Sequence, residues 1–177
     1  HNVGLARMYA AQSNAALAEA DDRFAARREE AMTLHASALE AYLSALEIVT
    51  ALAAADPQNL EAQRDLAICF NKVGNQRRDL KQTALALEAF TRSLEIRKET
   101  FRTDPTQRHR RDLALALRKL GEVRAGESQF AAARDLLSES VMHYEQLVQM
   151  SVMRAEDPDL AEVRKLLADV EAGVKKP

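Results

Sequence analysis

The sequence is poor in the residues that break helices or build sheets. Its 177 residues include no Trp, one Cys, five Gly and four Pro, and only 5% are aromatic. The low Gly and Pro content excludes collagen-like and low-complexity chains. The shortage of aromatic and turn residues argues against a sheet protein. The single Cys excludes an internal disulfide and suits a reducing compartment, so we expect a cytoplasmic location.

Long apolar runs and a strong net charge are also missing. No apolar run approaches the length of about 18 residues that suggests a membrane span, so we expect none. The first ten residues lack the basic start and apolar block of a signal peptide. The net charge of −2 gives no overall attraction to nucleic acid or anionic lipid. The chain begins without Met inside a helical pattern, which suggests a segment of a longer protein.

Alanine is abundant, with 33 residues, and the chain repeats itself. Three Pro residues directly follow Asp, at Asp56-Pro57, Asp104-Pro105 and Asp157-Pro158. Asp accepts hydrogen bonds from the free N–H groups of a helix start, and Pro fits the first helical position. The three pairs therefore predict three helix starts, 48 and then 53 residues apart.

Two longer strings recur at nearly the same period. QRDLAICFNKVG (63–74) resembles HRRDLALALRKLG (109–121), with Gly74 and Gly121 aligned 47 residues apart. ALEAYLSALEI (38–48) reappears 48 residues later as ALEAFTRSLEI (86–96). Apolar residues inside each period follow helical spacing. We therefore predict an all-α fold of repeated helix pairs, each of which buries its apolar side against the next pair.

The spacing resembles the tetratricopeptide repeat (TPR) over essentially the whole chain. The matching positions are Phe70-x2-Val73-Gly74-x2-Arg77, Ala86-x3-Phe90 and Ser93, then Leu117-x2-Leu120-Gly121-x2-Arg124, Ala133-x3-Leu137 and Ser140. Arg replaces the usual aromatic residue at Arg77 and Arg124, and the period exceeds the usual length of about 34 residues. Longer repeats of this kind are similar to those of kinesin light chains and many bacterial multi-repeat proteins. The resemblance implies a right-handed alpha-alpha superhelix with close helix contacts at the two Gly positions.

The expected layout is one domain, 1–177, of about three helix pairs and a capping helix. The units cover about 1–55, 57–103 and 105–156, and the capping helix covers 158–173. In the first unit 34 residues separate Gly4 from Ala38, whereas the other units use 12. We interpret the excess as an extended hairpin around 8–34, with helices at 2–20 and 22–55. The alternative is one uninterrupted helix, because neither Gly nor Pro interrupts it.

The sequence offers little support for catalysis, and we expect no enzyme, metal or cofactor. The four His residues are scattered, and Cys69 is best explained as a buried structural thiol. No phosphate-binding loop or metal-spaced set is present. Between Arg97 and Gly126 there are nine Lys or Arg against four Asp or Glu. Pairing with neighbouring helices explains this excess better than an acidic or phosphate partner, and nucleic acid binding is not expected because stacking aromatics are few.

Binding of a protein or peptide is the favoured function. In the family that the chain resembles, the first helix of each unit lines a concave surface. The residues expected there are Asn71, Asn75, Arg78, Arg118, Glu122, Lys72 and Lys119. Asn side chains can hold a peptide backbone, and Arg or Lys can bind a carboxylate. We expect an interaction scaffold that is part of a larger regulatory protein; the alternative is self-association through the long first hairpin or an end of the array, giving a homo-oligomer.

Overall fold

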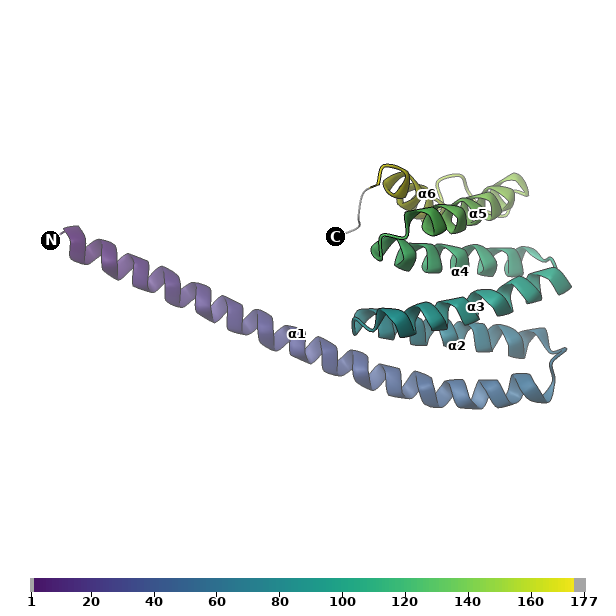
Figure 1. Ribbon diagram of the computed structural model, residues 1–177, viewed down its shortest axis with the longest axis horizontal. Coiled ribbons are helices and arrows are strands. Elements are labelled where there is room, and N and C mark those ends of the chain that lie inside the picture. Colours follow the sequence, from purple (N-terminus) through teal and green to yellow (C-terminus); the bar gives the residue numbers. More distant parts are fainter. Residues whose placement is uncertain (1, 174–177) are drawn as a thin grey trace.

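The computed structural model describes the backbone of residues 2–173 and the side chains of residues 23–173. Within residues 2–173 it contains six helices and no strand, so the predicted all-α class is confirmed (Figure 1). The helices are α1 (Asn2–Ala55), α2 (Leu60–Asp79), α3 (Thr83–Thr103), α4 (Gln107–Gly126), α5 (Phe130–Gln149) and α6 (Pro158–Glu171).

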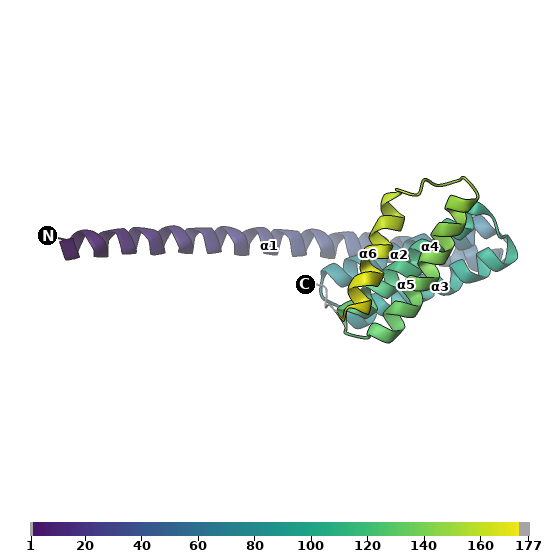
Figure 2. The same ribbon diagram turned by 90° about the horizontal axis from the view of Figure 1, so that it is seen from above.

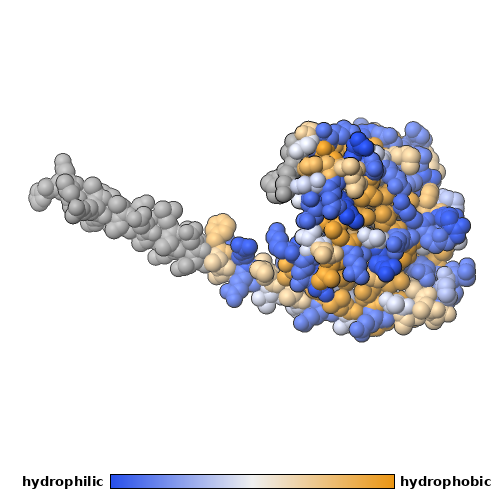
Figure 3. Space-filling model, viewed as in Figure 1, coloured by the Kyte–Doolittle hydropathy of each residue, from blue (hydrophilic) through white to orange (hydrophobic). Residues whose placement is uncertain are grey.

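α1 is one uninterrupted helix of 54 residues, and the predicted hairpin around 8–34 is wrong. Asp21 and Asp22 lie inside it, because the surrounding Ala, Glu and Arg residues are strong helix formers and nothing there reverses the chain. At the standard rise the helix is about 80 Å long. Its N-terminal part projects away from the other helices (Figure 1). Side chains 23–34 are all exposed (Figure 3).

Residues 35–55 of α1 and helices α2–α6 form what we call the helical stack. Each helix packs against the next in chain order, and α4 also contacts α6 (Figures 1 and 2). At the α1 end, Leu39 packs with Val73 and Ala89. At the other end, Tyr144, Leu147 and the apolar side of α6 form the largest buried cluster. Apolar contact between successive helices therefore runs through the whole stack.

The Asp-Pro pairs mark only one of the three predicted helix starts. α6 begins at Pro158, and the Asp157 carboxylate accepts the Asp159 N–H at 3.0 Å. α2 instead begins after Asn59, whose side chain accepts the Ala62 N–H at 3.1 Å. α4 likewise begins after Thr106. At the first pair, the Asp56 carboxylate accepts the Gln58 N–H at 3.2 Å. That contact forms a local turn, and the helix starts beyond it.

The turns inside the two helix pairs match in position. Lys81, between α2 and α3, and Ser128, between α4 and α5, both have φ of 61° and lie 47 residues apart. The third unit has 25 residues from Ala133 to Pro158, against 19 from Ala86 to Pro105 in the second unit, but the extra residues do not extend its second helix. α5 ends at Gln149, and the extra residues form a loop whose Met153 is 8% exposed and packs in the core with α6.

The two helix pairs share the close contacts expected at their glycines. Phe90 and Leu137, which face these glycines, are 1% and 0% exposed. A Cβ on Gly121 would lie 2.9 Å from the Leu137 Cγ atom. The hydroxyl of Ser140 donates to the carbonyl oxygen of Ala114 at 2.7 Å. The equivalent bond, 47 residues earlier, joins Ser93 to Ala67 at 2.8 Å.

Part of α1 meets the length and hydropathy criteria for a membrane span, although we expected no such span from the sequence. Among the described residues, Arg23–Ala55 is long and apolar enough to cross a membrane, with a mean hydropathy of 1.5 over an 18-residue window. Only 11% of that window is buried. Core helices of soluble proteins and signal sequences meet the same criteria. The finding therefore assigns no location to the chain.

Candidate functional site

Ion pairs between alternate helices hold α2, α4 and α6 side by side. Arg64 Nε of α2 lies 2.6 Å from Asp112 Oδ2 of α4. Arg111 of α4 makes the equivalent contact with Asp159 of α6 at 3.3 Å. Both contacts join residues 48 apart in sequence. The seven predicted binding residues lie on α2 and α4, so these pairs bring them to neighbouring helices.

Three of the predicted residues form one ionic cluster between α2 and α4. Glu122 Oε2 lies 3.8 Å from Arg78 Nη1 and 3.8 Å from Lys119 Nζ. Arg78 also bonds to the neighbouring Asp79 at 3.2 Å. Burial lowers the pKa of Lys119, the Glu122 carboxylate opposes this shift, and the nearby Arg118 adds to it. Through Arg78 and Glu122 the cluster links α2 to α4.

Arg118 is only 5% exposed and is held by α6. Its guanidinium donates to the carboxylate of Glu162, and its Nη2 lies 3.4 Å from Asp159 Oδ1. The sequence placed Arg118 on a free surface because it could not show that α6 would cover that position. Arg118 therefore fastens α6 to α4 and does not face a ligand while α6 is in place.

The remaining predicted residues, Asn71, Lys72 and Asn75, lie together on α2. Lys72 is exposed, and the two Asn side chains are half-buried. Asn75 Oδ1 is buried and has no hydrogen-bond donor among the described residues. Ile68 and Leu115, at equivalent positions of α2 and α4, are also half-buried. Amide groups beside partly exposed apolar side chains can bind both the backbone and a side chain of a peptide.

Neighbouring carboxylates pair with much of the basic stretch from Arg97 to Gly126, as expected. Arg108 contacts Glu61 at 2.5 Å, and Lys98 contacts Glu139 at 3.4 Å. Arg97 is 3% exposed and donates to the carbonyl oxygen of Asp112 at 2.6 Å, and burial lowers its pKa. These contacts make the local excess of basic residues part of the packing between helices.

Cys69 is a buried thiol, as predicted. It is 7% exposed, and its Sγ donates to the carbonyl oxygen of Tyr42 at 3.4 Å. Burial raises the pKa of the thiol, which keeps it protonated and unreactive. Among residues 23–173, no group of three or more His, Cys, Asp or Glu side chains could hold a metal ion.

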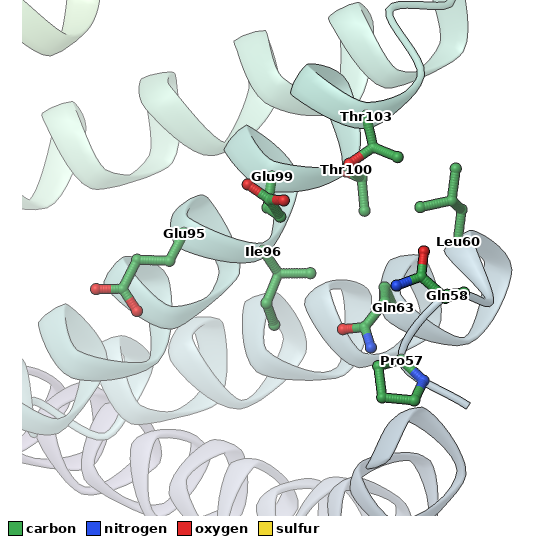
Figure 4. A pocket seen from close by; sticks show the side chains of 9 residues that line it. All are labelled: Pro57, Gln58, Leu60, Gln63, Glu95, Ile96, Glu99, Thr100 and Thr103. Atoms are coloured by element: carbon green, nitrogen blue, oxygen red, sulfur yellow. The ribbon is translucent and has the colours of Figure 1, made fainter. Parts of the chain in front are cut away.

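Two features were missed by the sequence analysis. One is a cavity of about 370 Å³ between the start of α2 and the second half of α3 (Figure 4). The exchange of Gln63 for Arg110 between the two repeats could have indicated it. The other is the open side of α1, where Ile48 and Leu52 are 64% and 59% exposed. This side of α1 is open because no hairpin partner packs on it, whereas we had interpreted the sequence as a hairpin.

Comparisons of the chain with protein-family models, with curated proteins and with solved structures find no match.

Proposed function

We propose that the chain is a non-enzymatic protein-interaction module of the tetratricopeptide type. Its helix pairs would form a right-handed superhelix, and a peptide or helix of a partner would lie across α2 and α4. The module would serve as one part of a larger regulatory protein. The repeated contacts at Gly74 and Gly121 and the matching Ser hydroxyl bonds support this assignment.

The observation that carries the proposal is the unpaired Oδ1 atom of Asn75. A buried acceptor without a donor costs about 1–3 kcal/mol, so rotation of the half-buried Asn75 amide towards a ligand that supplied an N–H group would recover that free energy. Asn71, one helical turn away, can both accept and donate. Lys72 beside them is exposed and can bind a carboxylate. Arg118 and the cluster around Glu122 position α4 and α6 for this surface.

The test starts from a displayed library of random peptides selected on the purified chain. Binding of a selected peptide is then measured by fluorescence anisotropy for Asn71→Ala combined with Asn75→Ala. We expect at least a tenfold loss of affinity, because two hydrogen-bonding side chains are removed. The matched control is Arg92→Ala combined with Arg134→Ala, two exposed positions on α3 and α5. Equal affinity of the two double variants, with unchanged circular dichroism, contradicts the proposal.

Self-association is the second candidate, and the open side of α1 favours it. The repeat aligns Leu52 with Thr100 of α3, which faces Leu60 and Gln63 of α2 and is 5% exposed. Leu52 itself is 59% exposed. We expect a concentration-dependent dimer in sedimentation velocity that Leu52→Glu dissociates. Leu85→Glu, at an exposed position of α3, is the control. A wild-type monomer at high concentration would eliminate this candidate.

A further inference from the structure

The cavity between α2 and α3 has a filled counterpart in the next helix pair. Its walls are apolar at Pro57, Leu60 and Ile96, and Thr100 and the Gln58 and Gln63 amides also line it (Figure 4). Glu99 lies at its edge on α3, whereas the Glu95 carboxylate is directed away (Figure 4). None of the predicted binding residues on α2 and α4 lines it, so it is a separate place in the molecule.

In the α4/α5 pair an arginine side chain occupies the equivalent position. Arg110, 47 residues after Gln63, extends towards α5. It donates to the Gln146 side-chain oxygen, and its Nη1 lies 3.3 Å from His143 Nδ1. Its Cζ atom lies 4.8 Å from the centre of the Phe101 ring. The chain thus shows what this site of the repeat holds: a guanidinium between an aromatic ring and the side chains of the second helix.

In the α2/α3 pair two smaller residues, Gln63 and Ala53, stand at the positions of Arg110 and Phe101 and leave the site unfilled. Gln63 replaces Arg110 and turns towards α1, where its Nε2 donates to the carbonyl oxygen of Ala53 at 3.2 Å. Ala53 stands 48 residues before Phe101, so no ring lies at the aromatic position. The cavity is the space that these two exchanges leave.

The second helix of this pair, α3, is better suited to bind a cation than its counterpart α5. Glu99 stands where α5 has Gln146, and a carboxylate is a stronger acceptor for a guanidinium than an amide. Ile96 stands where α5 has His143 and offers apolar contact to an aliphatic stem. In the structure Glu99 pairs with Arg102: the Arg102 Nη2 atom lies 2.5 Å from Glu99 Oε1, and both side chains are exposed. An exposed pair of this kind contributes little and can exchange partners.

We propose that this cavity receives an arginine side chain from a partner protein. The aliphatic stem lies along Ile96 and Leu60, and the guanidinium donates to Glu99, as Arg110 does to Gln146 in the next pair. The inference stands independently of the proposed peptide surface, because it uses different residues. It predicts that the charged guanidinium, and not merely the shape of the side chain, is recognised, since a guanidinium matches a carboxylate with two hydrogen bonds.

The experiment follows the methyl signals of the three Ile residues in NMR spectra of the intact chain during titration with N-acetyl-arginine methylamide. We expect the Ile96 methyl signals to shift and saturate while those of Ile68 stay in place. The citrulline analogue, which has nearly the same shape and no charge, should bind at least tenfold more weakly. No shift at Ile96, or an equal response to citrulline, overturns the proposal.

Two variants separate the cavity from general charge attraction. Gln63→Arg supplies the missing side chain from within, so it should abolish the Ile96 response at the same probe concentration. Glu99→Gln, at an exposed position that leaves the fold intact, should weaken binding at least threefold. Unchanged affinity in Glu99→Gln contradicts the proposal even if Gln63→Arg does not fold. If neither variant changes arginine binding, the proposal of a peptide surface on α2 and α4 still stands, because that surface uses other residues.

Discussion

The Phe90 ring lies directly against the backbone of Gly74, so close that a Cβ at residue 74 would be 2.8 Å from the Phe90 Cε1 atom. Phe90 is 1% exposed and cannot swing into solvent without opening the core. Gly74→Ala should therefore lower the free energy of unfolding by about 1–3 kcal/mol, the usual cost of overpacking. Urea denaturation followed by circular dichroism measures it.

Gly126→Ala is the matched control for this substitution. A Cβ at Gly126 meets nothing within 4 Å. Gly126 is the last residue of α4, whereas Gly74 lies inside α2. This variant should be neutral or up to about 1 kcal/mol more stable, because Ala favours helix. If both variants behave alike, the close contact between α2 and α3 is not what the glycine provides.

Tyr144 carries a buried hydroxyl that has no hydrogen-bond partner among the described residues. Tyr144→Phe removes that group and keeps the ring, so we expect stability to stay equal or to rise by about 1 kcal/mol. Burial raises the pKa of Tyr144 to about 12. The unfolded side chain ionises at its ordinary value of 10, so the wild type should lose stability above that pH and Tyr144→Phe should lose less. A clear loss of stability in the variant at pH 7 would contradict this view.

His143 should make the stability depend on pH in the acidic range. Burial lowers its pKa from 6.5, the Arg110 guanidinium lowers it further, and Glu139 opposes the shift. Below pH 6.5 the unfolded chain binds a proton at this residue before the folded chain does, so the free energy of unfolding falls as the pH falls. His143→Gln should show a shallower decline between pH 7 and 5 in urea titrations. Parallel declines for the two proteins would rule out this contribution.

Local patterns predicted the contacts inside a helix pair well. The spacing of Gly74, Phe90 and Ser93 indicates which residues must meet, because small and large side chains have to alternate where two helices approach. The burial of Phe90 and Leu137 confirmed that interpretation. Helix starts were predicted less well, since Asn59 and Thr106 compete with the Asp-Pro pairs as caps.

The course of α1 could not be derived in the same way. A repeat in sequence favours a hairpin, but only the local backbone preference decides whether the chain reverses at Asp21. The other two turns contain a residue with positive φ, Lys81 or Ser128, beside a polar neighbour. The region around Asp21 is Ala-rich and helical throughout. The burial of Arg118 by α6 could not be predicted either, because an alignment of the repeats does not show which later helix packs over a given residue.

The continuity of α1 as one helix has a direct distance test. Spin labels at Gln12→Cys and Leu34→Cys, with Cys69→Ser to remove the native thiol, would be about 33 Å apart along one helix. Measuring doubly labelled chains diluted with unlabelled protein reports the distance within one chain. A hairpin turning at Asp21 would bring the two labels to roughly 10 Å, the separation of packed helices. A main distance in that short range would contradict the single helix.

The proposed function depends on the two Asn side chains of α2, and their own NMR signals test it most directly. The chain has five Asn residues, so the side-chain NH₂ signals can be assigned one by one by substitution. On addition of a library-selected peptide, we expect the signals of Asn71 and Asn75 to shift, while that of Asn59, the cap of α2, stays in place. Binding of the peptide with no change at Asn71 or Asn75 would contradict the proposal that this face of α2 holds the partner.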